Sequence, residues 1–263
     1  MTIDKCTVKR FLFDVADHEM KIVKNDGLHR FVRFKKPDSG VFHFDLITWP
    51  YHLCITGDMG TFVFSRVEDM FAFFRGDLKS KHPINPSYWG EKMLSESRFG
   101  GFKEYDPDDF RRRVKNEFES FYEDSEDEKA KAKTWEELED RVLTFADDKF
   151  LAFNVVNDFK SRDGFYFDMA EFGDCKSFTY HFIWCCYALV YGINLFDLKT
   201  EVGDFLCKQT GEVCELVEGA TPGLRDGTYS GQCPANTFSL YAKTRIEFLK
   251  AVKSTCPNAR GKS

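Results

Sequence analysis

The chain has 263 residues, of which 43% are hydrophobic and 16% aromatic, and its formal net charge is −6 at pH 7. This composition supplies enough apolar side chains for a buried core and excludes a disordered chain. The acidity is local, because residues 104–128 carry a charge of −7 and the rest of the chain sums to +1. A chain with this balance is a poor candidate for general binding to nucleic-acid phosphates, which requires a basic surface.

The first third of the chain predicts a short helix followed by an antiparallel β-meander. Apolar residues within 7–17 recur at helical spacing. Short β-prone runs follow, separated by turn sequences rich in Gly, Pro, Asn and Asp; these runs are residues 20–23, 31–34, 41–46, 51–55 and 62–64. Residues 67–75 return to helical spacing, so we expect flanking helices to cover one side of the sheet.

Strong helix signals resume after the glycine pair at 100–101. Asp106 followed by Pro107 is typical of an N-cap and the first residue of a helix. Residues 134–137, Thr-Trp-Glu-Glu, form a capping-box pattern that predicts the start of a second helix. The charged stretch 123–133 between them is therefore expected to be an exposed linker.

The longest apolar helix candidate is residues 178–198, which are hydrophobic on nearly all sides and therefore predict a core helix. Its most apolar run, residues 182–193, is shorter than the roughly 20 residues needed to cross a bilayer, so no transmembrane segment is expected. An irregular segment containing Gly and Cys near 205–235 and an amphipathic helix at 238–252 are predicted to follow.

These patterns predict an α+β fold with two regions. Residues 1–100 are expected to form a domain in which an N-terminal antiparallel β-meander is flanked by helices, and residues 101–263 a mainly helical region. The first residues lack the apolar core of a secretory signal, so we expect an intracellular protein whose nine cysteines are reduced.

The best candidates for acid–base or metal chemistry lie in the meander. His43 and Asp45 alternate on a predicted strand and so point to one face, which His52 or Asp58 of the neighbouring hairpin can approach. Their spacing matches no established ligand set, and a catalytic metal needs three convergent ligands with an open position. We therefore predict no catalytic, cofactor-binding or metal-binding residues, and retain a metal-dependent nucleic-acid processing enzyme as the alternative.

The cysteines permit a zinc site without specifying one. His181 and Cys185 lie four residues apart, on one face of the predicted core helix. The cysteines of the C-terminal tail are Cys207, Cys214, Cys233 and Cys256. Because the chain contains no C-x-x-C pair, Cys185 and Cys186 are expected to be buried apolar side chains, and no cofactor is predicted.

Residues 30–36 alternate basic and aromatic side chains. A strand of this kind is able to stack the bases of single-stranded nucleic acid. The more frequent arrangement places Phe31 and the other apolar side chains inward and the Arg and Lys side chains outward, and this is the arrangement that we predict.

Two segments resemble a known family: FDLITWPYHLCITGDMGTFVFSRVEDMFAFFR, residues 44–75, and FTYHFIWCCYALVYGINLFDL, residues 178–198. They resemble proteins of phages and prophages of Proteobacteria and, within that group, the Gabija anti-defence protein family. The resemblance implies a non-enzymatic inhibitor in the host cytoplasm that forms a homo-oligomer around the bacterial Gabija complex. It implies that the nuclease subunit is kept from engaging or cleaving DNA, with no direct binding of nucleic acid or membrane by the inhibitor.

An inhibitor that acts by contact is expected to present large, rigid side chains. The predicted interface residues are aromatic side chains in or beside loops, together with acids of one helix: Trp49, Tyr51, Trp89, Phe99, Phe102, Glu117, Glu119 and Glu123. The acids also support a third hypothesis, in which the helix within residues 107–123 mimics nucleic acid.

Overall fold

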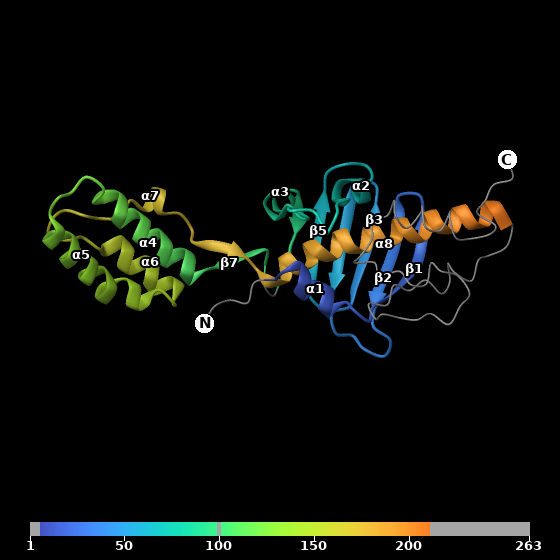
Figure 1. The fold of residues 1–263 in the computed structure, drawn as a ribbon, viewed down its shortest axis with the longest axis horizontal. Helices are drawn as coiled ribbons and strands as arrows, with labels where there is room; N and C mark the ends of the chain where they lie inside the picture. The colour runs from blue at the N-terminus through green and yellow to red at the C-terminus, as the bar shows by residue number, and fades with distance from the viewer. Residues whose placement is uncertain (1–5, 99–100, 211–263) are drawn as a thin grey trace. The chain divides into compact units, whose positions relative to one another are not determined.

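The computed structural model describes residues 6–98 and 101–210, with side chains described as far as residue 200. The chain forms two compact units (Figure 1). Unit 1 comprises Met1–Phe102 and Tyr180–Ser263, and unit 2 comprises Lys103–Thr179, so unit 2 is inserted into the chain of unit 1. The predicted α+β class, with an N-terminal antiparallel sheet followed by a mostly helical region, is confirmed.

Unit 1 is built on a six-stranded sheet in the order β1-β2-β3-β4-β5-β6, in which each strand pairs antiparallel with the next. The strands are β1 (Glu19–Asp26), β2 (His29–Lys35), β3 (Phe44–Trp49), β4 (His52–Gly57), β5 (Gly60–Ser65) and β6 (Met93–Ser95). The first five correspond to the predicted β-prone runs. The sixth is a three-residue edge strand that no sequence pattern indicated.

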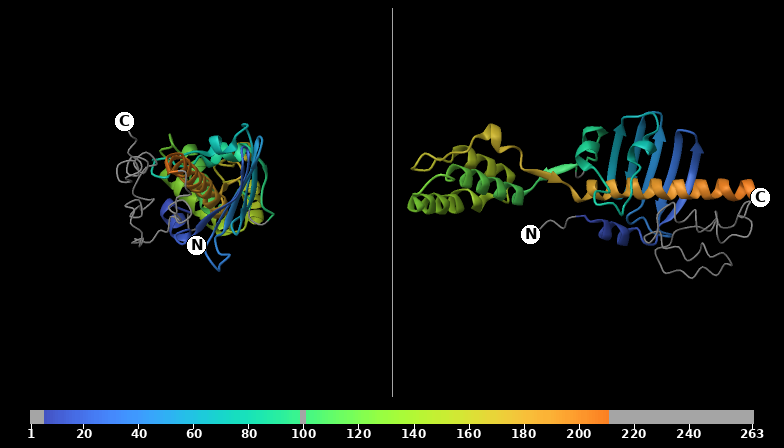
Figure 2. Two further views of the ribbon diagram at one scale, coloured as in Figure 1. Left: turned by 90° about the vertical axis from the view of Figure 1, so that its right-hand side faces the viewer. Right: turned by 45° about the horizontal axis from the view of Figure 1, so that its top comes forward.

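One face of this sheet, the inner face, is covered by helices. Side chains alternate between the faces of a strand, and eight apolar side chains on the inner face are at most 1% exposed: Val32, Phe34, Phe44, Leu46, Leu53, Ile55, Phe62 and Phe64. The long helix α8 (Tyr180–Thr210) lies across this face with α1 (Val8–Asp14) on the same side (Figure 2). The short helices α2 (Met70–Phe74) and α3 (Pro86–Glu91) complete the cover, since Phe74 contacts both Phe64 and Trp89.

Helix α8 is the centre of the unit 1 core. It packs tightly on the sheet at Gly192, where an added Cβ would lie 2.8 Å from Leu46 Cδ1 and 3.0 Å from Phe34 Cε2. Trp184 is fully buried and its ring contacts those of Phe11 and Phe44, with centroids 5.0 and 5.7 Å apart. By length and composition Tyr180–Thr200 is able to cross a membrane, but 72% of its most apolar stretch is buried inside the protein.

The position of α8 differs from the predicted division of the chain. The sequence assigned everything after residue 100 to a second, helical region, whereas α8 belongs to the same unit as the sheet. The physical reason is that the apolar inner face and the apolar helix each need a partner, and each provides it for the other. The predicted helix at 238–252 and most of the irregular segment near 205–235 lie outside the described residues.

Two ion pairs fasten the helices of unit 1. Arg30 of β2 points to the inner side and donates from both Nη atoms to Asp69, at 2.7 and 3.1 Å, with its guanidinium 4.7 Å from the ring centroid of Phe71. Asp69 is also the N-cap of α2. Arg75, the residue after α2, donates to Asp197 of α8 at 2.8 and 3.1 Å. Together the two pairs join strand, short helix and core helix.

Unit 2 is a helical unit that begins and ends in a two-stranded ribbon. The ribbon pairs β7 (Lys103–Tyr105) with β8 (Lys176–Phe178). Between these strands lie α4 (Pro107–Phe121), α5 (Glu128–Arg141), η1 (Leu143–Phe145), α6 (Lys149–Asp158) and α7 (Met169–Phe172). Their core is rich in aromatic rings and includes Phe110, Phe118, Phe165 and Phe172.

The two predicted helix starts in unit 2 had different outcomes. Asp106 caps α4 and Pro107 is its first residue, which confirms the first prediction. The second is wrong, because α5 starts at Glu128 with Asp127 as its N-cap, and Thr134 is buried within the helix. Part of the predicted linker is therefore the first turn of α5.

Candidate binding surface

The second face of the unit 1 sheet, the outer face, lies opposite α8, and no described helix of unit 1 covers it (Figure 2). Four apolar side chains cross this face in register, because Phe31 pairs with Ile47, Ile47 with Cys54, and Cys54 with Val63. All four are half-buried. We call Phe31, Ile47, Cys54 and Val63 the apolar row.

The apolar row overturns one prediction. Phe31 was expected to point inward and the basic residues of β2 outward, but Phe31 shares the outer face with Arg33, while Arg30 points inward. The buried side chains of β2 are Val32 and Phe34. The reason is the ion pair of Arg30 with Asp69, a long-range contact that makes an inward arginine stable.

An ion pair borders the apolar row on one side. Arg33 donates from Nε and Nη2 to the two carboxylate oxygens of Asp45, at 2.9 and 2.8 Å, and its guanidinium lies 5.2 Å from the ring centroid of Phe31. The hydrogen bond with Asp45 raises the pKa of Arg33 above its usual value. Asp45 is only 7% exposed, so the carboxylate depends on this partner. Next to the pair, the hydroxyls of Thr56 and Thr61 hydrogen bond at 2.7 Å.

Aromatic side chains border the row at the β3–β4 turn. The rings of Trp49 and His52 stack with centroids 5.0 Å apart, and His52 Nδ1 donates to the Pro50 carbonyl at 2.9 Å. Tyr51 is 52% exposed and has a φ of 68°, a left-handed conformation that is rare for a bulky residue. Its backbone is held by hydrogen bonds with Glu68 and Arg66. The turn therefore presents Tyr51 in a fixed position.

The structure separates the aromatic interface candidates. Trp49 and Tyr51 are exposed, at 37% and 52%. Trp89 is 7% exposed and packs on Phe74, so its ring belongs to the core. Phe102 is half-buried with its ring against Phe182, and Phe99 lies outside the described residues.

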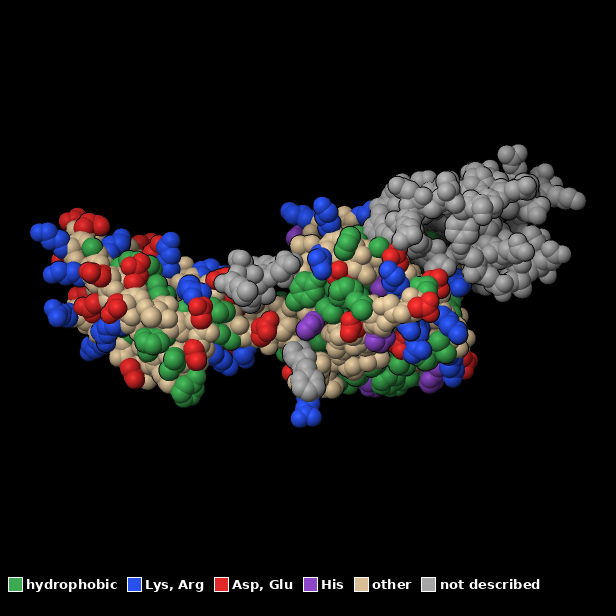
Figure 3. Space-filling model, turned by 90° about the horizontal axis from the view of Figure 1, so that it is seen from below, with side chains coloured by type: hydrophobic (Ala, Val, Ile, Leu, Met, Phe, Trp, Pro, Cys, Tyr) green, Lys and Arg blue, Asp and Glu red, His purple; other side chains and the backbone are tan. Residues whose placement is uncertain are grey.

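The acidic candidates lie on or just after α4. Glu117 is half-buried, whereas Glu119 and Glu123 are exposed. Glu119 pairs with Lys115 at 3.6 Å, and two further acids of α4 have arginine partners: Asp108 pairs with Arg111, and Asp109 with Arg113. Figure 3 shows acidic and basic side chains interspersed over unit 2. This mixture differs from the continuous negative surface that a nucleic-acid mimic needs.

The predicted acid–base cluster is not assembled. His43 precedes β3 and its Nδ1 donates to a backbone carbonyl at 2.6 Å, Asp45 pairs with Arg33, and His52 stacks on Trp49. The carboxylate of Asp58 accepts a backbone N–H at 2.8 Å. Within residues 6–98 and 101–200, no group of three or more His, Cys, Asp or Glu side chains is placed to hold a metal ion.

The cysteine candidates fall into two groups. His181 is exposed, whereas Cys185 and Cys186 are buried, as predicted, and Cys185 Sγ donates to a backbone carbonyl at 3.6 Å. Burial raises the pKa of both thiols well above the usual value, and metals bind the thiolate. The side chains of the tail cysteines, Cys207, Cys214, Cys233 and Cys256, lie outside the described residues.

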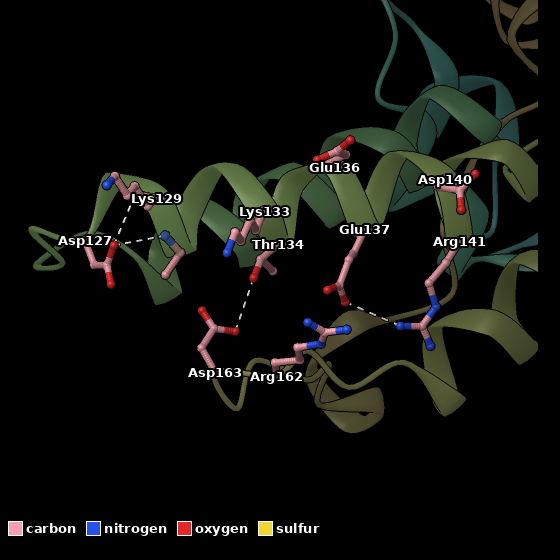
Figure 4. Close-up of a pocket in the computed structure, with 11 residues that line it drawn as sticks. Asp127, Lys129, Lys133, Thr134, Glu136, Glu137, Asp140, Arg141, Arg162 and Asp163 are labelled. Carbon is pink, nitrogen blue, oxygen red and sulfur yellow. Dashed lines mark hydrogen bonds and ion pairs between the residues drawn. The ribbon is translucent and has the colours of Figure 1, made fainter.

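Unit 2 contains an open cleft of about 710 Å³ beside α5 (Figure 4). At one end Asp163 accepts hydrogen bonds from the hydroxyls of Tyr122, Ser161 and Thr134, the last at 3.2 Å. Desolvation works against the charged carboxylate, but the hydrogen bonds outweigh it and lower the pKa of Asp163, whereas burial raises the pKa of Tyr122 to about 12. These hydrogen bonds dock the hairpin of residues 160–166 on α4 and α5.

The residues that sequence reasoning missed are Asp163 and the apolar row. The sequence Ser161-Arg162-Asp163-Gly164 is a turn pattern that indicates the hairpin, although not its contact with Thr134. The apolar row becomes visible only when the strands are placed in register.

No family model matches this chain, and no curated protein and no solved structure matches it either. The functional argument therefore depends on the surfaces that the described residues present.

Proposed function

We propose that this chain is a non-enzymatic binding protein and that the outer face of the unit 1 sheet is its contact surface for a protein partner. The observation that carries the proposal is the apolar row, Phe31, Ile47, Cys54 and Val63, which crosses four strands and is covered by none of the helices that the structure describes in unit 1. An antiparallel sheet with one solvated face usually alternates apolar inner with polar outer side chains. Apolar side chains in the centre of an outer face therefore favour an interaction site.

The surroundings of the apolar row support the same function. Protein interfaces combine an apolar centre with a polar rim, and they are enriched in aromatic and arginine side chains. Here the rim contains Arg33 with Asp45 on one side and Trp49 with His52 on the other. Tyr51, exposed and fixed by its backbone hydrogen bonds, extends the surface at the turn.

The resemblance to the Gabija anti-defence family provides the partner to test first. In this proposal the chain acts in the host cytoplasm, assembles as a homo-oligomer around the bacterial Gabija complex and keeps its nuclease subunit from engaging or cleaving DNA. The resemblance rests on residues 44–75 and 178–198. The first of these segments contains three of the four residues of the apolar row.

The test is a binding titration of purified chain against purified Gabija complex, with DNA cleavage by the complex as a second readout. We expect binding at micromolar concentration or below, inhibition of cleavage, and a loss of affinity of about tenfold or more in Ile47→Lys. The matched control is Phe13→Lys, which introduces the same charge at a side chain of α1 that is 75% exposed. Thermal unfolding of both variants verifies that they fold.

Two results would overturn the proposal at different levels. Absence of binding at micromolar concentration excludes the Gabija complex as the partner. Binding that Ile47→Lys and Phe13→Lys weaken equally, or not at all, excludes the outer face as the contact surface.

A further inference from the structure

Two cationic side chains lie opposite each other on the outer face, beside the apolar row. Register places Lys21 of β1 directly opposite Arg33 of β2, and like charges in opposite cross-strand positions repel each other. Lys21 is exposed, and the Arg33 side chain is 47% exposed although it pairs with Asp45. Arg33 uses Nε and Nη2 for Asp45, which leaves Nη1 directed away from that carboxylate. Two cationic groups are thus available next to Phe31.

The acids of the outer face already have other basic neighbours, since Asp26 pairs with Lys24 at 4.0 Å and Glu19 lies opposite Lys35 in register. The outer sides of β4 and β5 carry hydroxyl groups, and the two threonines Thr56 and Thr61 hydrogen bond to each other. Asp45 is committed to Arg33. An anionic group of a partner would therefore contact both Lys21 and Arg33 and would reduce the repulsion between these two cations.

The spacing of the apolar row indicates the form of the partner. Four adjacent strands span about 14 Å at about 4.8 Å per strand. Successive turns of a helix are about 5.4 Å apart, close to this spacing, whereas side chains on one side of an extended segment recur at about 6.6 Å. A helix of two to three turns lying across the strands would place one apolar side chain over each member of the row.

We infer that the surface binds an acidic amphipathic helix of the partner protein, with its apolar stripe on Phe31, Ile47, Cys54 and Val63 and its carboxylates on Lys21 and Arg33. This inference rests on the proposed function and specifies the chemistry of the partner. The Arg33 guanidinium pairs with Asp45 and still has N–H donors for a second carboxylate. The ammonium group of Lys21, opposite Arg33 on the neighbouring strand, adds a second positive charge.

A protein helix fits this face better than single-stranded nucleic acid. The charged side chains of the outer face are Glu19, Lys21, Lys24, Asp26, Arg33, Lys35 and Asp45, so cations barely outnumber anions. Stacking of bases needs open aromatic rings, but Arg33 lies over Phe31 and His52 stacks on Trp49. The central positions of the apolar row, Ile47 and Cys54, carry no aromatic ring.

The first experiment uses designed peptides of about 16 residues that carry leucine at the i, i+4, i+7 and i+11 positions of a helix, one in each turn. One peptide has glutamate on its polar face, one has lysine, and one is a scrambled version of the glutamate peptide. We expect the glutamate peptide alone to bind, with an affinity that falls as the salt concentration rises. Binding is measured by calorimetry and by backbone NMR shifts on β2 and β3.

Two charge-reversal variants test whether Lys21 contacts the glutamate peptide. Lys21→Glu is expected to weaken binding of the glutamate peptide by about tenfold or more, and Lys9→Glu, the same change at an exposed lysine of α1, to leave it unchanged. Equal binding of the lysine or scrambled peptide overturns the inference, as does an equal effect of the two variants. Tighter binding of an oligothymidine of about 12 nucleotides overturns it in favour of nucleic acid.

The same variants separate this inference from the proposed function. If Ile47→Lys abolishes binding of the Gabija complex while Lys21→Glu does not affect it, the acidic helix is excluded and the proposed contact surface stands. If the glutamate peptide binds with the expected dependence on Lys21 while the Gabija complex does not bind, the inference stands and the partner is a different protein.

Discussion

The two faces of the six-stranded sheet are made by the same strands and differ in what covers them. On the inner face Phe34 and Phe44 stack with ring centroids 4.5 Å apart and are each 1% exposed. On the outer face Phe31 and Ile47, which pair across the same two strands, remain half-buried. Because side chains alternate between the two faces of a strand, the same strands contribute buried side chains to the core and partly exposed side chains to the proposed contact surface.

The largest expected effect is a difference in stability between the faces. Phe34→Ala should lower the free energy of unfolding by about 3–5 kcal/mol, because it removes a ring from a closed core and leaves a cavity. Ile47→Ala should lower it by only about 1 kcal/mol, since its side chain is already partly in water. Urea denaturation measures both values. Similar losses at the two positions would show that the outer face is as closely packed as the inner face.

Two arginines of β2 give a second contrast. Arg30→Ala should cost about 3 kcal/mol, because the Arg30 side chain is 11% exposed and its removal leaves Asp69 in a partly desolvated site. Arg33→Ala should cost less, about 1 kcal/mol. Asp45 also loses its partner, but the Arg33 side chain is 47% exposed on the outer face, so its removal lets water reach the Asp45 carboxylate. A double-mutant cycle of Arg30 with Asp69 isolates the pair. A smaller loss for Arg30→Ala than for Arg33→Ala would contradict the assignment of Arg30 to the core.

The smallest expected effect is a dependence of the free energy of unfolding on pH, caused by His18, the buried histidine directly before β1. His18 is 3% exposed; its Nε2 donates to the Phe42 carbonyl at 3.0 Å, and its Nδ1 is buried without a hydrogen-bond partner among the described residues. Burial lowers the pKa of His18 below the ordinary value of 6.5. The unfolded chain therefore binds a proton that the folded chain excludes, so the free energy of unfolding should fall as the pH drops through 6.5.

The control for this prediction is His18→Gln, which keeps a donor for the Phe42 carbonyl and does not titrate. Denaturation of both proteins between about pH 7 and pH 5 should show a shallower loss of stability in the variant. Parallel profiles would show that other groups cause the dependence on pH.

The sequence could predict the meander because its turns are local signals, and β1 to β5 lie where Gly, Pro, Asn and Asp separate the β-prone runs. It could not predict the orientation of β2. The sequence Arg30-Phe31-Val32-Arg33-Phe34 is compatible with two orientations, one with Phe31 facing the core and one with Val32 and Phe34 facing it. The choice depends on the ion pair of Arg30 with Asp69, which is 39 residues further along the chain. Register errors of this kind reverse every side chain of a strand.

The same limit applies to α8 and to the candidate site. The apolar pattern of residues 178–198 predicted a core helix. It does not say which core the helix joins, because strands β1 to β5 of the partner sheet are more than 100 residues earlier in the chain. Trp49 and Tyr51 were identified because they flank Pro50 in a turn sequence. The apolar row consists of residues from four different strands, and no local pattern brings them together.

The position of α8 also has a consequence for the order in which the chain folds. During synthesis, β1 to β6 leave the ribosome before α8 exists, so the inner face has to wait for the whole of unit 2 to be translated before Trp184 can reach Phe11 and Phe44. Unit 2 has no such delay, because its own contacts close when β8 pairs with β7. The inserted unit is thus expected to fold first, while the sheet that begins the chain is completed after it.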